Sequence, residues 1–241
     1  LRIHPDYAQA VLDNASKQHH TVGMVTVTAG LGCPRSRALE ASDEALAVNP
    51  LDYNALLIGQ AWDNFITHDK LVLRGSIAGI PIAGEIDRVR RLGSDLLVED
   101  WKHANNNAQR FLKKEIAEGK AVKFEYRIQT SIYAELYRQT FNEQPTRGMI
   151  WNHYSGAASG DWNSVLIPLL YDLVPLDEAL AFKPYSGAYT VGELYQQAAA
   201  LYEDDPIKWS DLPLVGETMS FGSKSFCDYC QVRDACFTQA K

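Results

Sequence analysis

The chain has 241 residues and a mass of 26.9 kDa, with 46% hydrophobic and 22% charged residues. These proportions are those of an ordinary globular protein, and they exclude a disordered chain, a collagen-like fibre and a coiled coil. The formal net charge is −7, so any nucleic-acid role needs a local basic surface or metal ions that offset the carboxylates.

The beginning of the chain predicts a location away from membranes. Leu1 is followed by no basic-then-apolar signal segment, and no apolar run approaches the roughly 18–20 residues of a membrane span. We therefore expect a cytoplasmic, intracellular protein without a membrane partner, and a phage genome is one of its possible sources.

Residues 1–70 are predicted to form an N-terminal helical part. A polar helix or arm, a strand or the approach to a helix, a helix stopped by Asn49-Pro50 and a stretch of helical spacing follow one another. These elements are expected at 5–20, 22–27, 35–48 and 53–67.

Residues 71–175 are predicted to form the core of an α/β domain. Short strands separated by glycines come first, followed by the short apolar run Leu96–Val98, which suits a buried central strand. A long helical pattern interrupted near Gly119 precedes two further strands. The expected strands are 71–73, 77–82, 86–89, 96–98, 149–154 and 165–171, and the expected helix is 104–141.

Residues 176–241 are predicted to form a C-terminal helical part, with helices at 176–182 and 191–203 and little periodicity over 209–226. No repeat, low-complexity tract or linker divides the chain. We therefore expect a single α/β domain over 1–241, in which helices flank a central mixed sheet.

Cysteine spacing indicates a metal centre. Cys227, Cys230 and Cys236 form C-x2-C-x5-C, and Cys33 lies almost two hundred residues earlier. Four thiolates suit a tetrahedral zinc ion or an iron–sulfur cluster. Clustered thiols and disulfides are the alternatives, and a chain without a secretory signal disfavours disulfides. Zinc sites usually pair two C-x2-C knuckles, so this spacing favours iron–sulfur. One centre holding all four would bring the chain ends together and stabilise the fold.

Two carboxylates and a lysine are predicted to meet on neighbouring strands. Asp87 precedes a turn and Asp100 follows it, so a hairpin can set them side by side. Asp100 and Lys102 leave the same face of a strand, while Glu99 and Trp101 point the other way. Such acids can hold Mg²⁺ or Mn²⁺ for phosphodiester hydrolysis, with the lysine orienting water or stabilising the phosphorus centre. The alternative is a surface hairpin with an ordinary salt bridge.

Basic residues gather in the same stretch and could follow a phosphate backbone despite the net charge. The alternative is an ordinary solvated surface. The residues are Arg88, Arg90, Arg91, Arg110, Lys113, Lys114, Lys120 and Lys123.

Several motifs together resemble a known family. GEIDRV at 84–89 and LLVEDWK at 96–102 resemble the second and third motifs of the RecB-like branch of the PD-(D/E)XK nuclease superfamily. Gln129 and Tyr133 match its Q-x-x-x-Y motif, and they share a helix face. The cysteines, opening with Cys33-Pro34-Arg35, resemble the iron–sulfur subgroup of CRISPR-associated RecB-like exonucleases and AddB nuclease domains.

The resemblance implies a fold and a site. It implies a restriction-endonuclease-like core with an iron–sulfur clasp joining the termini. Asp87, Asp100 and the carbonyl of Trp101 would be metal ligands, and Lys102 would be the catalytic lysine. Gln129 and Tyr133 would contact the DNA strand or order the site. Cys33, Cys227, Cys230 and Cys236 would hold a [4Fe-4S] cluster.

One position departs from the family. The usual G-x-x-x-H histidine ligand is replaced by Asp63 in Gly59–Asp63, which changes the donor but still suits a hard cation. His68 is a weaker alternative ligand. Trp101 stands where tyrosine is usual.

The resemblance implies a Mg²⁺- or Mn²⁺-dependent DNA exonuclease that acts on single-stranded ends. The alternative is a nuclease-derived DNA-binding module that is weak or inactive in cleavage and is stabilised by an iron–sulfur or zinc centre. Partner proteins would belong to CRISPR adaptation, phage recombination or DNA repair.

Overall fold

The computed structural model describes residues 24–41, 70–105, 114, 118, 124–155, 166–181, 188–200, 220–221, 224–225, 230 and 236–237. The chain forms two compact units, each assembled from separate stretches of sequence. The terminal unit contains 1–58, 77–82 and 177–241, and the central unit contains 59–76 and 83–176. The prediction of a single domain over 1–241 is not tested by this division and stays a prediction.

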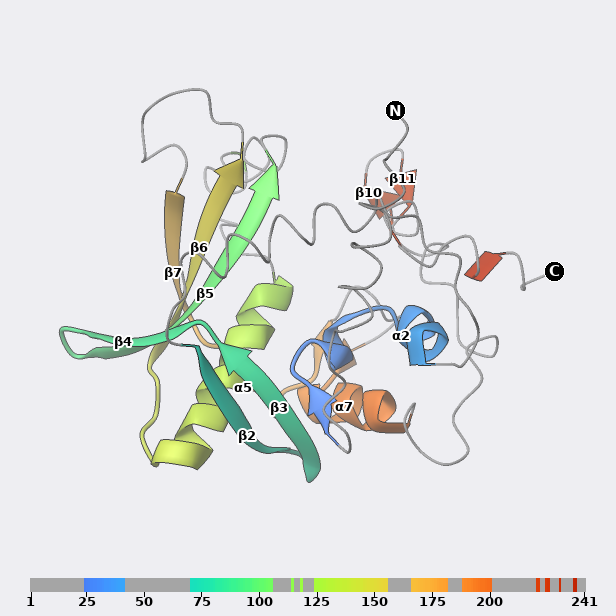
Figure 1. The fold of residues 1–241 in the computed structure, drawn as a ribbon, viewed down its shortest axis with the longest axis horizontal. Helices are drawn as coiled ribbons and strands as arrows, with labels where there is room; N and C mark the ends of the chain where they lie inside the picture. Colours follow the sequence, from blue (N-terminus) through green and yellow to red (C-terminus); the bar gives the residue numbers. More distant parts are fainter. Residues whose placement is uncertain are drawn as a thin grey trace, which may run out of the picture. The chain divides into compact units, whose positions relative to one another are not determined.

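A mixed four-stranded sheet organises the central unit (Figure 1). Its strand order is β4-β5-β6-β7, and the β5–β6 pair is parallel while the two outer pairs are antiparallel. Parallel neighbours need a crossover connection, and here the crossover contains α5. The elements are β4 (Arg88–Leu92), β5 (Asp95–Asn105), α5 (Phe124–Phe141), β6 (Arg147–Ser155) and β7 (Leu166–Asp172).

Helix α5 covers the sheet because its sequence has an apolar stripe. Ile128, Ile132 and Leu136 recur every four residues and are fully buried. The helix contacts β5 and β6. Next to it, Gly148 of β6 leaves space for the ring of Tyr171, whose hydroxyl lies 2.6 Å from the hydroxyl of Thr130. A Cβ at residue 148 would lie 2.5 Å from that ring, so this pairing requires glycine.

Strands β2 (Leu71–Ile77) and β3 (Ile80–Ile86) form a hairpin around Ala78 and Gly79. Both turn residues have positive φ, 50° and 82°, which is the geometry of the commonest two-residue hairpin turn. Within the central unit, Gln139 of α5 binds the backbone of Ser76 through both amide atoms, at 2.9 and 2.8 Å. This pair of hydrogen bonds anchors β2 to α5.

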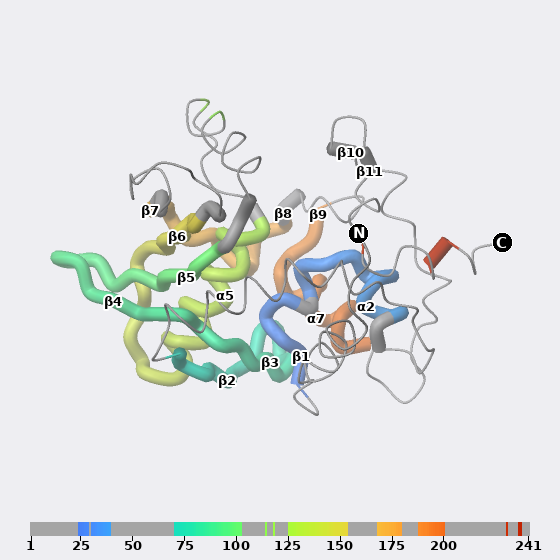
Figure 2. Tube along the Cα trace, turned by 45° about the horizontal axis from the view of Figure 1, so that its top comes forward, coloured from blue at the N-terminus to red at the C-terminus, as the bar shows by residue number. Residues whose placement is uncertain are grey.

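Within the terminal unit, η1 (Ala29–Leu31), α2 (Pro34–Ala41), β1 (Val25–Thr26) and β9 (Ala188–Tyr189) contact α7 (Val191–Ala200), and Figure 2 shows α2 and β1 beside it. Thr190 and Glu193 cap this helix reciprocally, at 3.2 and 2.7 Å. Tyr195 is fully buried and donates to the carbonyl of Val27. The other described elements are β8 (Leu180–Ala181), β10 (Ser220–Phe221) and β11 (Lys224–Ser225).

The expected mixed α/β architecture with helices beside mixed sheets is confirmed. The helix expected at 176–182 is wrong, because Leu180–Ala181 pairs with Ala188–Tyr189 as a short ladder. A seven-residue segment has little helical stability of its own, so strand pairing decides its conformation.

The bounds of the strands expected at 71–73 and 77–82 are also wrong. Strand β2 continues through Gly75 to Ile77, and the turn lies at Ala78–Gly79. The helix or arm expected at 5–20 and the helix expected at 53–67 lie outside the described residues. None of the described helices combines the length and the apolar character that crossing a bilayer requires.

Candidate active site

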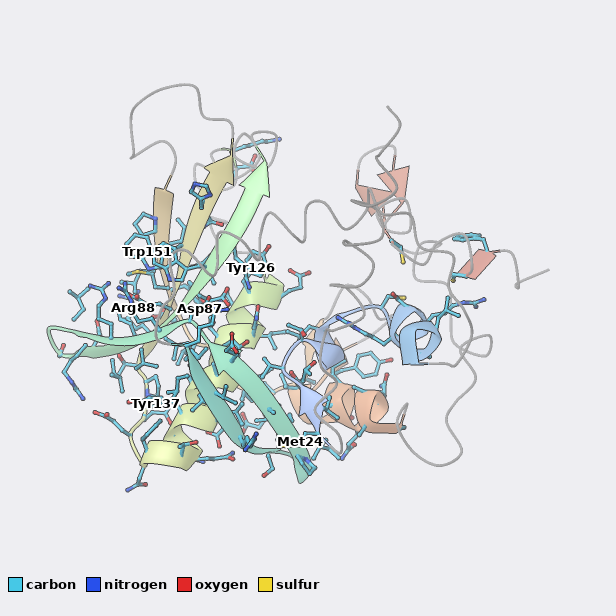
Figure 3. The ribbon with its side chains drawn as sticks, viewed as in Figure 1. Met24, Asp87, Arg88, Tyr126, Tyr137 and Trp151 are labelled. Carbon is cyan, nitrogen blue, oxygen red and sulfur yellow. The ribbon has the colours of Figure 1, made fainter. Side chains whose placement is uncertain are left out.

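The β4–β5 hairpin brings Asp87 and Asp100 to adjacent positions. Arg88 pairs with Glu99 in the antiparallel register, so Asp87 falls opposite Asp100 one step further along. The backbone N–H of Trp101 donates to Asp87 Oδ2 at 2.7 Å. The two carboxylate side chains are 9% and 6% exposed. Figure 3 shows Asp87 where β3 passes into β4, close to β5 and α5.

Lys102 lies on the same face as Asp100, two residues further along β5. Its ammonium is 2.7 Å from Asp100 Oδ2, donates to Gln129 Oε1 at 3.0 Å, and lies 5.0 Å from the ring centre of Tyr126. Three separate groups therefore hold one charged donor between β5 and α5.

Gln129 and Tyr133 extend this chain of contacts along α5. They are one helical turn apart, and Gln129 Nε2 donates to the Tyr133 hydroxyl at 3.3 Å. Both side chains are buried, with residue exposures of 7% and 5%. The structure thus joins Asp100, Lys102, Gln129 and Tyr133 in one continuous polar network between β5 and α5.

Burial and charge act on the two titratable donors of the network. Burial lowers the pKa of Lys102, but the Asp100 carboxylate, followed by Tyr126 and Asp87, raises it by more, so the net pKa lies above the ordinary value. Burial raises the pKa of Tyr133 well above its usual range, and the negative charges of Asp100, Asp87 and Glu85 raise it further. Both groups therefore carry their protons at neutral pH.

The opposite face of β5 has a different character. Glu99 is fully buried and binds the guanidinium groups of Arg88 and Arg90, the latter at 2.7 Å. Trp101 stacks on Trp151 with ring centres 5.1 Å apart. Glu99 and Trp101 therefore point away from Asp100, as strand alternation predicts. Of the basic residues expected to follow a phosphate backbone, Arg88 and Arg90 are bound to Glu99, and Arg91 is bound to Glu143. Arg110, Lys113, Lys120 and Lys123 lie outside the described residues.

Sequence reasoning missed three polar residues near the network. Lys70 lies 4.0 Å from Asp87 Oδ1, Tyr126 underlies the Lys102 ammonium, and Asn152 is buried beside Lys102 in the parallel β5–β6 register. Asn152 could have been found from the sequence, because it is a polar residue within the predicted strand 149–154. No local pattern marks Lys70 or Tyr126, because strand pairing and the β5–α5 packing bring them to the site.

The cysteine set is described in part. Cys33 precedes α2, and within the terminal unit the start of α2 lies near two other cysteines of the set. Cys230 Sγ lies 3.9 Å from the Ser36 hydroxyl, and the Arg35 guanidinium donates to the carbonyl of Cys236 at 3.4 Å. Cys227 and the candidate ligand Asp63 lie outside the described residues, as do Gly59 and His68. Within the part of the chain that the structure describes, no group of three or more His, Cys, Asp or Glu side chains is arranged to hold a metal ion.

Comparison with known proteins places these features in context. The family model described as "PD-(D/E)XK nuclease superfamily" matches residues 5–237. No curated protein matches the chain. A solved structure titled "Crystal structure of SSO0001" is similar, with a TM-score of 0.55 and 14% identity over 96% of this chain and 94% of that chain. This similarity concerns the fold alone, and the mixed α/β arrangement is consistent with the expected restriction-endonuclease-like core.

Proposed function

Because the chain belongs to the PD-(D/E)XK nuclease superfamily, whose members are generally nucleases that use divalent metals, we propose that it is a Mg²⁺- or Mn²⁺-dependent deoxyribonuclease. Its proposed substrate is single-stranded DNA, which it degrades from an end. The observation that carries the proposal is the contact chain from Asp100 through Lys102 and Gln129 to Tyr133, with Asp87 beside it.

The donor chemistry of the acid pair fits a hard cation. Asp87 and Asp100 are adjacent, nearly buried carboxylates, and such groups are costly unless they are paired or bind metal. With the Trp101 carbonyl they would supply oxygen ligands, and Asp63 is proposed as a further one. A bound Mg²⁺ or Mn²⁺ would offset the phosphate charge and activate a water molecule.

The chain's own residues supply orientation and charge around that ion. Lys102 carries a positive charge at a fixed position, because Asp100 and Gln129 hold its ammonium. A preorganised donor of this kind stabilises negative charge that develops on the phosphate. Tyr133 orients Gln129, and the N–H of Trp101 orients the Asp87 carboxylate. Each group is held by a neighbour before any substrate arrives.

End-labelled DNA tests the proposal. With Mn²⁺ or Mg²⁺ the protein is expected to shorten linear single strands labelled at the 5′ or the 3′ end, and EDTA is expected to abolish the reaction. A circular single strand should resist cleavage if an end is required. DNA binding without any metal-dependent cleavage would replace the proposal with the DNA-binding module. Cleavage of the circle would retain the nuclease and reject the exonuclease.

We also propose that Cys33, Cys227, Cys230 and Cys236 hold a [4Fe-4S] cluster that stabilises the terminal unit. Support comes from the thiol chemistry and from the start of α2, near which Cys230 and Cys236 approach Ser36 and Arg35. Such a cluster would join stretches almost two hundred residues apart, and closing so long a loop stabilises a fold.

Cys230→Ser is expected to lose the cluster and to lower the thermal midpoint of the protein. Metal-thiolate bonds contribute folding free energy because the unfolded chain has no preformed site. Iron content and visible absorbance of anaerobically purified protein report the cluster, and circular dichroism reports the midpoint. Ser36→Ala, which changes a neighbour of Cys230 and removes no thiol, is the control. Stoichiometric zinc in a colourless protein would contradict the cluster, and an equally stable iron-free variant would contradict its stabilising role.

A further inference from the structure

Lys70 lies beside the candidate active site of the central unit, and the proposed reaction assigns it no role. The turn at Ala78–Gly79 sets residue 77 opposite residue 80, so counting outward sets Lys70 opposite Asp87. The measured separation from Lys70 Nζ to Asp87 Oδ1 is 4.0 Å, which agrees with this count. Lys70, Asp87 and Asp100 therefore form a row across neighbouring strands, with an ammonium at one end.

The ammonium of Lys70 has a second carboxylate partner. Its Nζ lies 2.8 Å from Glu85 Oε1, and Glu85 is half exposed whereas the Lys70 side chain is 21% exposed. An ion pair with one solvated partner is weak, because water competes for the charges. Lys70 can therefore exchange Glu85 for another anion at little cost.

The two ammonium groups are the local attraction for such an anion, and the divalent cation proposed for the acid pair would add to it. Glu85, Asp87 and Asp100 carry three negative charges, and Lys70 and Lys102 carry two positive ones, so the side chains alone leave a net negative charge that this cation would offset. Lys102 is held by Asp100 and Gln129, whereas Lys70 is held on the Glu85 side by an exposed carboxylate. Lys70 thus lies at one end of the row, beside Asp87, and Lys102 lies beside Asp100, two residues further along β5. The two ammonium groups therefore take separate positions around the acid pair.

We propose that Lys70 is a substrate-binding residue of this site, and that it leaves Glu85 to bind a phosphate of the DNA strand next to the one that is cleaved. The proposal rests on the proposed nuclease function and adds a binding position to it. Glu85 is then a competitor of the DNA phosphate for Lys70. The role is one of affinity, so it separates from the role of Lys102 in the reaction.

Steady-state cleavage of a single-stranded oligonucleotide in saturating Mn²⁺ tests this role. Lys70→Met is expected to raise KM about 5-fold with kcat nearly unchanged, while Lys70→Arg keeps most of the affinity. Loss of one phosphate contact is expected to reduce the slope of log(kcat/KM) against log[salt] by about 0.7. Arg138→Met, which removes a 45% exposed arginine paired with Glu135 of the same helix, is the control and should change neither quantity.

Glu85→Gln provides a second, independent measurement. It should lower KM in the wild-type background and have a much smaller effect in Lys70→Met, because the competition requires the lysine. An equal effect in both backgrounds would overturn the competition with Glu85. An altered Mn²⁺ half-saturation with an unchanged salt slope would overturn the inference and make Lys70 a positioning residue for Asp87.

The two proposals fail in different ways. If the wild type cleaves DNA and Lys70→Met behaves like Arg138→Met, only the Lys70 inference is lost. If the wild type cleaves no DNA with any metal, the nuclease proposal is lost. Fluorescence anisotropy with the same oligonucleotide then decides whether Lys70 binds phosphate, since an unchanged affinity and salt slope in Lys70→Met would overturn it.

Discussion

Lys102→Ala is expected to lose DNA cleavage while the protein stays folded. The variant removes the ammonium that Asp100 and Gln129 hold at 2.7 and 3.0 Å. Loss of one preorganised donor to developing charge typically costs about 10²–10³ in kcat. The loss should appear in kcat with KM little changed, because we assign this charge to the transition state. Assays at saturating Mn²⁺, with circular dichroism of the same samples, measure both properties.

Arg138→Ala is the control for Lys102→Ala, since it removes an equal charge from an exposed position. Saturating metal matters because Asp100 loses its cationic partner in the Lys102 variant, which changes the competition for its oxygens. Cleavage within about 10-fold of the wild type would remove Lys102 from the mechanism, because the donor argument predicts a larger loss. A lost circular-dichroism signal would instead indicate that the Lys102–Asp100 pair is required for folding.

The double variant Arg88→Met/Arg90→Met is expected to destabilise the protein by about 3–5 kcal/mol, because it leaves a buried carboxylate without its charged partners. Glu99 is fully buried, and both arginines bind it from β4. Adding Glu99→Met should recover much of the lost stability, since an apolar replacement of a whole buried ion cluster is often neutral. Urea unfolding of the three proteins measures the free energies.

Arg91→Met is the matched control on the same strand. Its partner Glu143 is 43% exposed, so this pair should contribute about 0–1 kcal/mol. If the double variant keeps its stability but binds single-stranded DNA more weakly, the phosphate-tracking role considered for these arginines would hold instead. A loss of stability in Arg91→Met as large as in the double variant would show that burial of Glu99 does not decide the effect.

The two faces of β5 therefore differ in function: one presents the proposed reactive groups, and the other packs within the fold. On one face, Asp100 and Lys102 meet Gln129 and Tyr133 of α5. On the other face, Glu99 and Trp101 are held by arginines and by the Trp151 ring. The one-residue alternation of a strand separates reaction chemistry from structural packing along a single segment.

Much of this arrangement was predictable from local spacing. The two-residue spacing of Asp100 and Lys102 predicts one strand face, and the four-residue spacing of Gln129 and Tyr133 predicts one helix face. The order of the motifs also predicted the superfamily, which is confirmed, whereas the iron–sulfur subgroup stays a prediction. Strand ends and the segment 176–182 were less predictable, because pairing with a distant segment decides them.

By itself, the sequence determined which chemical groups each strand and helix presents and on which face, because side-chain direction repeats every two residues in strands and every 3.6 in helices. Only the tertiary structure decided that Lys70 lies beside Asp87, that Tyr126 underlies Lys102, and that Glu99 captures Arg88 and Arg90. These contacts depend on hairpin register and on how α5 packs against the sheet. Such long-range contacts depend on the sum of many weak interactions across the fold, and the periodicity of a local segment does not predict them.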